Sequence, residues 1–348
     1  SVQGGSTAHK TKIIYIKINN YMIKNIILTL KMNNKNILII GGTGQFGMTL
    51  SQMLSKKKYK VFATSRYIKK VNRFNLEYPK IKYIKLNIIN KSEIRKILKK
   101  TNPSIIFYFA GQSSPQKSFK KRNETFRSNF DGCKNILEVI HKENLKIKFL
   151  NAASSEMYGN IKNKIDLNTP KKPLNPYGIA KKKSFNLLKE YREKFNMQNY
   201  NAIIFNTESF YRSENILAKV CIGAIKAFKF KKKFTLDNIN FSREWNWCVE
   251  QCELLMKFIK KKPQDFILSN GKSYSIEKML FYAFNFFNLN YKDYLNLKFK
   301  KSKNIEVNTK KSNYKKYFTK NKINFESKIF GKKLIHKMIN FYLKQDNI

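Results

Sequence analysis

The stretch Ile37-Leu38-Ile39-Ile40-Gly41-Gly42-Thr43-Gly44-Gln45-Phe46-Gly47 decides the fold. Four apolar residues typical of a strand lead into a glycine loop, and residues 48–54 leave it with helical spacing. Glycine allows a tight turn and a close approach of the backbone to a pyrophosphate, whose charge the N–H groups at the helix start would hold. A plain glycine-rich turn is the alternative interpretation. The pattern predicts a dinucleotide-binding loop with these contact residues: Gly41, Thr43, Gly44, Gln45, Phe46 and Gly47.

A second signature consists of Ser154 and a later Y-x-x-x-K string, Tyr177 to Lys181. A lysine four residues after a tyrosine lies on the same helical face, one turn on. Tyrosine is a poor base at its reference pKa of about 10, but the lysine charge and an oxidised nicotinamide favour the phenolate. Y-x-x-x-K is common by chance in amphipathic helices. Here a predicted strand, 148–153, leads into Ser154, so we interpret the set as the site of an enzyme that moves a hydride at a carbinol carbon.

The ribose end of the cofactor site has a cation where an acid is usual. Chains that bind NAD carry Asp or Glu about 20 residues beyond the loop, at the end of the second strand. The second predicted strand, 60–65, is followed by Arg66, and no acid occurs before Glu77. An arginine there suits a 2′-phosphate, which favours NADP. A solvated arginine in a lysine-rich chain is the alternative.

Several strings resemble the extended short-chain dehydrogenases/reductases that modify nucleotide sugars, and most of all the GDP-mannose 4,6-dehydratases. The resemblance covers about residues 36–270. Residues 44–47 are similar to T-G-Q-D-G, 109–114 to L-G-A-Q-S-H, 153–159 to S-T-S-E-L-Y-G, 175–181 to S-P-Y-G-A-A-K, 205–209 to F-N-H-E-S and 243–245 to R-D-W.

The resemblance implies a lyase that converts GDP-mannose to GDP-4-keto-6-deoxymannose with NADP. Tyr177, beside Ser154 and Lys181, would take the proton of the sugar 4-hydroxyl, and Glu156 would remove the C5 proton and help to expel the C6 hydroxyl as water. Hydride taken from C4 would return to C6. The further cofactor contacts implied are Arg66, Asn87, Ala110, Gln112, Tyr177 and Lys181. The substrate contacts implied are Ser113, Ser155, Asn206, Glu208, Lys219 and Arg243.

Departures from the family pattern keep other functions open. The substrate half has Lys301–Asn304 where an Arg-Pro-x-Glu string is frequent, and a lysine replaces a two-pronged clamp with a point charge. Ser209–Arg212 stands where S-P-R-R is usual. Glu156 separates an eliminating enzyme from a simple reductase, although it could be a surface carboxylate. A nucleotide-sugar reductase, epimerase or decarboxylase is the alternative, and a cofactor-binding protein without catalysis is the non-enzyme alternative.

The order of predicted elements indicates an α/β fold. Strands alternate with helical stretches from Asn36 to about Ser209, which predicts a Rossmann-type doubly wound parallel sheet with a smaller C-terminal α/β substrate lobe. We assign 32–206 to the NADP-binding domain, with a returning segment at about 238–270. Residues 207–237 and 271–346 form the substrate lobe. We expect 1–31 to be a leader or added extension outside the fold, with Met32 as the natural start.

Composition limits the possible classes. A chain of 348 residues with 42% hydrophobic content is globular rather than disordered. The net charge of +49 comes from lysines spread along the whole chain without a nucleic-acid-binding motif, so we expect no specific nucleic-acid partner. The four cysteines and three histidines show no metal-site spacing, which favours a reduced cytoplasmic compartment and no metal. We expect a homodimer or homotetramer that does not enter membranes.

Overall fold

The structure is a computed structural model, which describes residues 36–161, 164–298 and 312–345. The predicted leader, 1–31, and the string Lys301–Asn304 lie outside the described residues. Across the described part, no helix is both long and apolar enough to cross a membrane.

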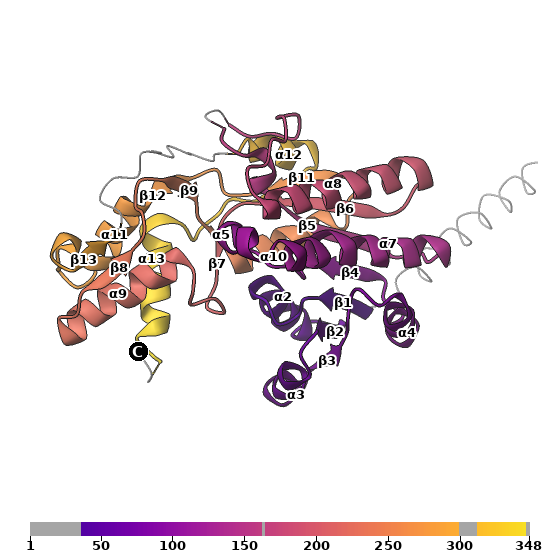
Figure 1. Ribbon diagram of the computed structural model, residues 1–348, viewed down its shortest axis with the longest axis horizontal. Helices are drawn as coiled ribbons and strands as arrows, with labels where there is room; N and C mark the ends of the chain where they lie inside the picture. Colours follow the sequence, from indigo (N-terminus) through magenta and orange to yellow (C-terminus); the bar gives the residue numbers. More distant parts are fainter. Residues whose placement is uncertain (1–35, 162–163, 299–311, 346–348) are drawn as a thin grey trace, which may run out of the picture.

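A seven-stranded sheet forms the centre of the larger lobe, with the strand order β11-β6-β5-β4-β1-β2-β3 (Figure 1). All of its pairings are parallel. The Rossmann-type fold predicted from the sequence is therefore confirmed. The strands of this sheet are β1 (Asn36–Ile40), β2 (Lys60–Ser65), β3 (Ile81–Lys85), β4 (Ile105–Tyr108), β5 (Lys148–Ser154), β6 (Asn199–Ile204) and β11 (Asp265–Leu268).

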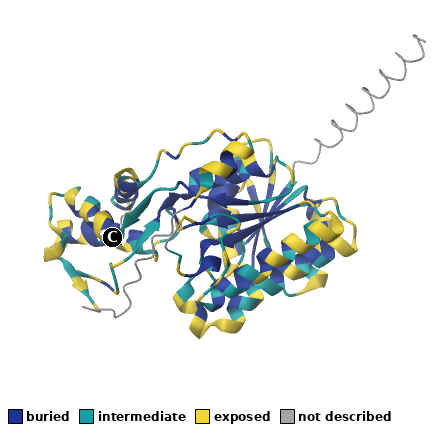
Figure 2. Ribbon diagram, turned by 90° about the horizontal axis from the view of Figure 1, so that it is seen from above, coloured by how far each residue is buried: buried dark blue, intermediate teal, exposed yellow. Residues whose placement is uncertain are grey.

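Helices cover both faces of the sheet, so this lobe has three layers. The helices and short turns of this part of the fold are α2 (Gln45–Ser55), α3 (Ile68–Glu77), α4 (Lys91–Thr101), α5 (Pro115–Lys120), α6 (Arg122–Phe126), η1 (Arg127–Asp131), α7 (Gly132–Lys142), η2 (Ser155–Tyr158), α8 (Pro176–Phe195), α10 (Cys248–Phe258) and α12 (Tyr314–Lys320). Alternate residues of β1 face opposite layers: Ile37 and Ile39 pack with α2, α3 and α10, and Leu38 and Ile40 with α4, α7 and α8. A central parallel strand must be apolar on both faces, which explains the unbroken apolar run that leads into the glycine loop. Figure 2 shows the sheet mostly buried between helices whose outer sides are exposed.

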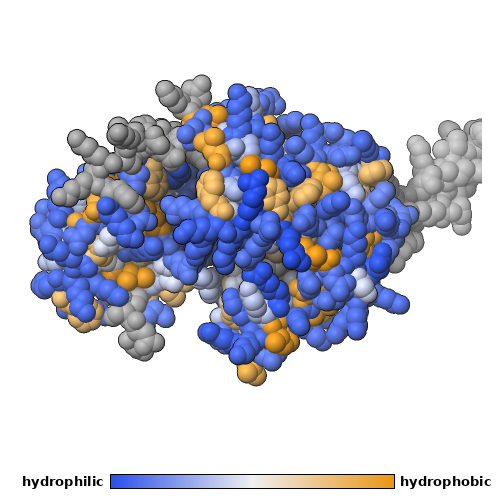
Figure 3. Space-filling view, in the orientation of Figure 1, coloured by the Kyte–Doolittle hydropathy of each residue, from blue (hydrophilic) through white to orange (hydrophobic). Residues whose placement is uncertain are grey.

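A second apolar core organises the smaller lobe. Its elements are β7 (Thr207–Glu208), α9 (Ile216–Phe230), β8 (Phe234–Leu236), β9 (Ser242–Glu244), β10 (Asn246–Trp247), β12 (Ser273–Ser275), α11 (Ile276–Asn285), η3 (Tyr291–Asp293), β13 (Leu295–Leu297) and α13 (Gly331–Tyr342). Helices α9, α11 and α13 enclose Trp245 and Trp247. Within 271–346, helix α12 packs on the sheet side, where its Phe318 lies 5.7 Å from Phe258 between ring centroids. Hydrophilic side chains cover most of the face drawn in Figure 3.

A partly buried ion pair fixes the returning strand β11 at the edge of the sheet. Arg192 Nη2 on α8 lies 2.8 Å from Asp265 Oδ1, and the two side chains are 16% and 13% exposed. Asn201 Nδ2 on β6 donates to the same carboxylate oxygen at 3.0 Å. Side chains from α8, β6 and β11 therefore meet at this edge of the sheet.

Arg192→Met should lower the free energy of unfolding by about 3 kcal/mol, because a desolvated carboxylate loses its guanidinium partner. Urea unfolding measures this change. Lys189→Met is the matched control, since it breaks an exposed pair with Glu193 on the same helix and should change stability by less than about 0.5 kcal/mol. Equal losses in the two variants would contradict the assignment.

Candidate active site

The glycine loop packs so closely on the loop after β4 that only glycine fits at Gly41. Gly41 has a φ of +84°, and a Cβ on it would lie 2.6 Å from the backbone nitrogen of Ala110, in the loop after β4. The N-cap of α2 is Gly44, which has no side chain to cap the helix, and no acidic residue lies in the first turn. Open N–H groups and the absence of negative charge suit a pyrophosphate at this helix start. The residues present therefore fit the predicted cofactor.

Three amides predicted to contact the cofactor are held by the protein itself. Gln45 Nε2 donates to the carbonyl of Thr207, and Gln45 Oε1 accepts from Ser209 Oγ, both at 3.2 Å. Gln112 Nε2 donates to the carbonyl of Ser114 at 2.8 Å, and Asn87 Oδ1 accepts from the N–H of Ile89 at 3.1 Å. Gln45 thus joins the glycine loop to β7, and Gln112 and Asn87 shape their own loops. Phe46 is buried, with its ring centroid 5.4 Å from that of Phe109.

Arg66 lies where the sequence places it, directly after β2, but it has an acidic neighbour. Its Nη2 is 2.7 Å from Glu124 Oε1 on α6, and its guanidinium carbon lies 4.7 Å from the ring centroid of Tyr67. The hydrogen bond from Arg66 lowers the pKa of Glu124, so the carboxylate is ionised at neutral pH. The sequence alone shows no acid at this strand end, because Glu124 comes from a distant helix.

The four predicted catalytic residues come together at the carboxyl end of β5. Ser154 ends the strand, and its Oγ accepts from the N–H of Glu156 at 3.2 Å, which caps the turn η2. Helix α8 starts beside this turn at Pro176, as predicted, with Tyr177 in its first turn. Lys181 Nζ donates to the carbonyl of Ala152 in β5 at 2.7 Å and lies 5.7 Å from the centroid of the Tyr177 ring.

The electrostatic state of this group is set mainly by burial. Desolvation raises the pKa of Tyr177, a hydrogen bond from Ser154 lowers it, and the nearby charge of Glu156 raises it. Burial lowers the pKa of Lys181 to about 8. Tyr177 is therefore a phenol at rest, and Lys181 is still mostly protonated at pH 7. The arrangement can place a phenolic acid/base, a cation and one carboxylate around the same part of a bound substrate.

The predicted substrate residues are more widely distributed. Ser113, Asn206 and Lys219 are exposed, whereas Ser155 and Glu208 are buried. Burial raises the pKa of Glu208 to about 7, and its Oε2 accepts from Asn215 Nδ2 at 3.0 Å at the start of α9. In β9, the Arg243 guanidinium carbon lies 5.1 Å from the ring centroid of Phe241.

Two residues of this region were missed in the sequence. The positive charge of Arg212 lowers the pKa of both Tyr177 and Glu208, so Arg212 lies near both of these side chains. Its position in the string that replaces S-P-R-R was the available signal. Asn175 bonds to Glu156, and its place directly before Pro176 marks it as a helix cap.

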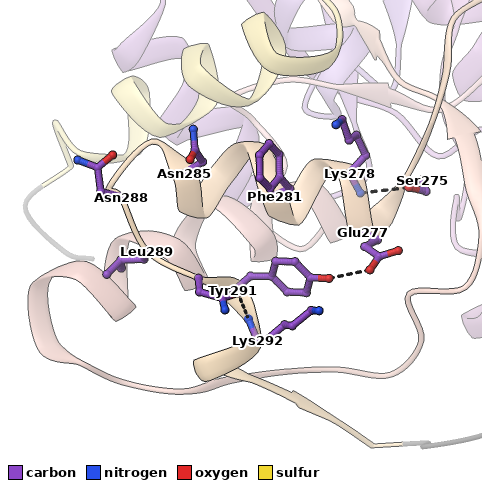
Figure 4. A pocket seen from close by; sticks show the side chains of 10 residues that line it. Ser275, Glu277, Lys278, Phe281, Asn285, Asn288, Leu289, Tyr291 and Lys292 are labelled. Atoms are coloured by element: carbon purple, nitrogen blue, oxygen red, sulfur yellow. Dashed lines mark hydrogen bonds between the residues drawn. The ribbon is translucent and has the colours of Figure 1, made fainter.

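One cavity of about 690 Å³ lies in the smaller lobe, between α11 and η3 (Figure 4). Phe281, Asn285 and Lys292 are among its lining residues, and Tyr291 Oη donates to Glu277 Oε1 at 2.7 Å. None of the predicted site residues lines it. The part of the chain that the structure describes also has no group of three His, Cys, Asp or Glu side chains that could hold a metal ion.

The fold and the Ser154, Tyr177 and Lys181 group define an enzyme of the short-chain dehydrogenase/reductase class. The family model for GDP-mannose 4,6-dehydratase matches residues 38–332. This chain belongs to that family.

Relatives agree with this assignment, and solved structures agree with the fold. The chain is 27% identical over 326 residues to GDP-mannose 4,6 dehydratase 1 of Arabidopsis thaliana, covering 88% of this chain and 89% of the relative. It is 28% identical over 267 residues to GDP-mannose 4,6 dehydratase of Drosophila melanogaster, covering 72% and 68%. Among structures, dTDP-glucose 4,6-dehydratase of Bacillus anthracis in complex with NAD gives a TM-score of 0.76 at 17% identity, covering 89% and 97%. UDP-glucose 4-epimerase of Thermus thermophilus, also with NAD, gives 0.76 at 14%, covering 88% and 99%. The two structures show a shared fold.

Lys181→Met should reveal the cost of burying this lysine. The folded-state pKa of about 8 is below the ordinary value of 10.5, so between these values the unfolded chain binds more protons. The wild-type protein should therefore gain stability relative to the variant as pH rises through this window, by up to about 1.4 kcal/mol per pH unit. Unfolding at pH 7.0 to 10.5 measures the difference. Lys183→Met, which removes an exposed lysine, controls for the loss of one charge, and a pH-independent difference for Lys181→Met would refute the shift.

Proposed function

We propose that this protein is a GDP-mannose 4,6-dehydratase that uses NADP and converts GDP-mannose to GDP-4-keto-6-deoxymannose and water. Family membership supports the reaction. The observation that carries the proposal is the position of Glu156, whose N–H donates to Ser154 Oγ at 3.2 Å at the end of β5 and whose backbone packs on the first turn of the helix that carries Tyr177. A plain reductase needs one acid/base group at the carbinol, whereas elimination needs a second base for the C5 proton.

The cofactor would lie across the glycine loop. The first turn of α2 would hold its pyrophosphate, and Lys181 and Tyr177 would lie at the nicotinamide end. When bound, the nicotinamide takes up the hydride of the sugar C4 and gives it back to C6. Arg66 supports NADP over NAD, since a 2′-phosphate offers the guanidinium more negative charge than Glu124 does, and an exposed ion pair is weak.

The chain's own residues would then divide the proton transfers. Tyr177, a phenol at rest, first loses its proton to solvent, which the Lys181 charge and the Ser154 hydroxyl favour, and the phenolate then takes the proton of the 4-hydroxyl. The resulting 4-keto group acidifies the C5 hydrogen, and Glu156 removes it. Glu156 then protonates the departing C6 hydroxyl, so water leaves and a solvent-derived proton returns to C5. The net reaction converts one GDP-mannose into one GDP-4-keto-6-deoxymannose and one water, with the cofactor unchanged.

The nucleotide diphosphate would lie toward the smaller lobe. Lys219 and Arg243, together with Asn206, are the proposed contacts, and we add Arg212 because its charge reaches the catalytic group. Glu208 is buried against Asn215 and would act by placing the start of α9. The large positive charge of the chain favours capture of an anionic sugar nucleotide. A homodimer or homotetramer and a cytoplasmic location stay predictions.

Heavy water distinguishes dehydration from simple redox chemistry. Wild-type protein given GDP-mannose and NADP in deuterium oxide should form a 4-keto-6-deoxy product with deuterium at C5, and no reduced cofactor should accumulate. Glu156→Gln cannot accept the C5 proton, so product formation should fall by about 10²-fold or more. Mass spectrometry and NMR of the product measure both effects.

Glu190→Gln is the control for this experiment, because it neutralises an exposed carboxylate on the helix that carries Tyr177. It should leave turnover unchanged. Stoichiometric consumption of NADPH by a keto sugar, with no effect of Glu156→Gln, would favour the reductase alternative. A product inverted at one carbon without loss of water would favour an epimerase.

Cofactor preference tests Arg66. Calorimetric titration of the wild-type protein should show NADP binding at least about 10-fold more tightly than NAD, from a charge-assisted contact worth about 1.5–3 kcal/mol. Arg66→Asp should abolish or reverse this preference. Glu124→Gln should increase it, because the variant removes the carboxylate that shares the guanidinium. Equal affinities for the two cofactors in the wild-type protein would disprove the NADP assignment.

A further inference from the structure

Asn175 lies between two parts of the active site and bonds to both. Its Nδ2 donates to Glu156 Oε2 at 3.1 Å, and its Oδ1 accepts from the N–H of Gly178 at 2.8 Å. The first bond reaches the turn η2, and the second caps helix α8, which carries Tyr177 and Lys181. One amide therefore touches the proposed C5 base and the helix of the proposed C4 acid/base.

The two partners require this amide in this orientation. The N–H of Gly178 can only donate and an ionised Glu156 carboxylate can only accept, so the residue between them must offer one acceptor and one donor. An asparagine does so without charge. Serine begins the S-P-Y-G-A-A-K string quoted above, and its hydroxyl can cap the helix as well as asparagine does. A serine hydroxyl can both accept and donate, but its oxygen lies one bond closer to the backbone than the amide nitrogen of Asn175, which is 3.1 Å from Glu156 Oε2. While it caps the helix, the shorter side chain therefore falls short of the Glu156 carboxylate.

The backbones of the two parts are also in close contact. A Cβ on Gly178 would lie 2.6 Å from the carbonyl oxygen of Glu156, so the first turn of α8 packs directly on η2. The backbone contact sets the spacing of the two elements but not the direction of the Glu156 side chain. The amide of Asn175 contacts the carboxylate itself, through its bond to Oε2.

We propose that Asn175 is a positioning residue that holds the Glu156 carboxylate in line for C5 deprotonation while it caps the helix of Tyr177. The inference rests on the proposed function, because it assigns Glu156 the role of base. Two effects that are usually confounded, helix stability and carboxylate placement, can be separated at this position. Serine keeps the first and removes the second, and alanine removes both.

Asn175→Ser should melt within about 0.5 °C of the wild-type protein, and Asn175→Ala should melt about 2 °C lower, since an N-cap is worth about 1 kcal/mol. Both variants should lose kcat by about 10-fold or more with little change in KM, because a misplaced base slows the chemical step rather than binding. The isotope effect on kcat with GDP-[5-²H]mannose should rise in both. Asn290→Ser, the same exchange at the cap of η3 in the smaller lobe, should change none of these values.

The inference would be overturned if Asn175→Ser had the kcat and the melting temperature of the wild-type protein and only Asn175→Ala lost both. Asn175 would then be a helix cap alone. The double variant Glu156→Gln with Asn175→Ser should be no slower than Glu156→Gln alone, and an additional loss would also overturn it. Failure of the proposed function looks different, since Glu156→Gln alone would then keep wild-type turnover.

A melting cycle tests the contact without any turnover. The shifts in melting temperature of Asn175→Ser and Glu156→Ala should fail to add in the double variant, because the two side chains are in direct contact. Additive shifts would show that the two side chains are not coupled and would overturn the inference whatever reaction the enzyme catalyses.

Discussion

Parallel pairing of β1, β4, β5 and β6 is the constraint on which the site depends. In a parallel sheet every strand ends at the same edge, so the loops that follow these strands must meet there. The glycine loop, the Ala110 loop and the Ser154 turn are brought to one edge by pairing alone. Gly41 then permits the first two loops to touch, and Gly178 permits α8 to pack on the third. The side chains on these loops supply the reactive groups, and strand pairing sets how far apart the loops lie.

Burial shifts the pKa values of several ionisable side chains near this edge toward their neutral forms. Lys181 is almost fully buried and bonds to a backbone carbonyl, so its ammonium group is held at a cost to the fold. Tyr177 and Glu208 are also shifted toward their neutral forms by burial. A water-poor site strengthens each interaction with a bound, charged ligand. Burying these groups lowers the stability of the fold but would favour the proposed chemistry, and such a trade-off is common in enzymes.

Much of the fold could be predicted from local pattern. The second strand has the bounds that its apolar run suggests, and α8 starts at Pro176, because strand composition and a proline at N1 are short-range signals. The pairing of Arg66 with Glu124 could not be predicted, since it depends on how a helix 58 residues away is placed. Glu208 occupies a substrate-like motif, yet it is buried, because exposure is decided by tertiary packing rather than by the string. Asn175 could have been found as a cap, but not as a partner of Glu156.

The position of β11 has a consequence for how the chain acquires its structure. This strand pairs with β6, yet 64 residues separate Asn201 from its partner Asp265, and much of the smaller lobe is formed in between. During synthesis, the outer edge of β6 stays unpaired until that intervening segment has emerged. An open, apolar strand edge invites pairing with other chains. The larger lobe is thus not separable as an N-terminal fragment, and shortened products of this chain are expected to aggregate rather than to fold as a cofactor-binding half.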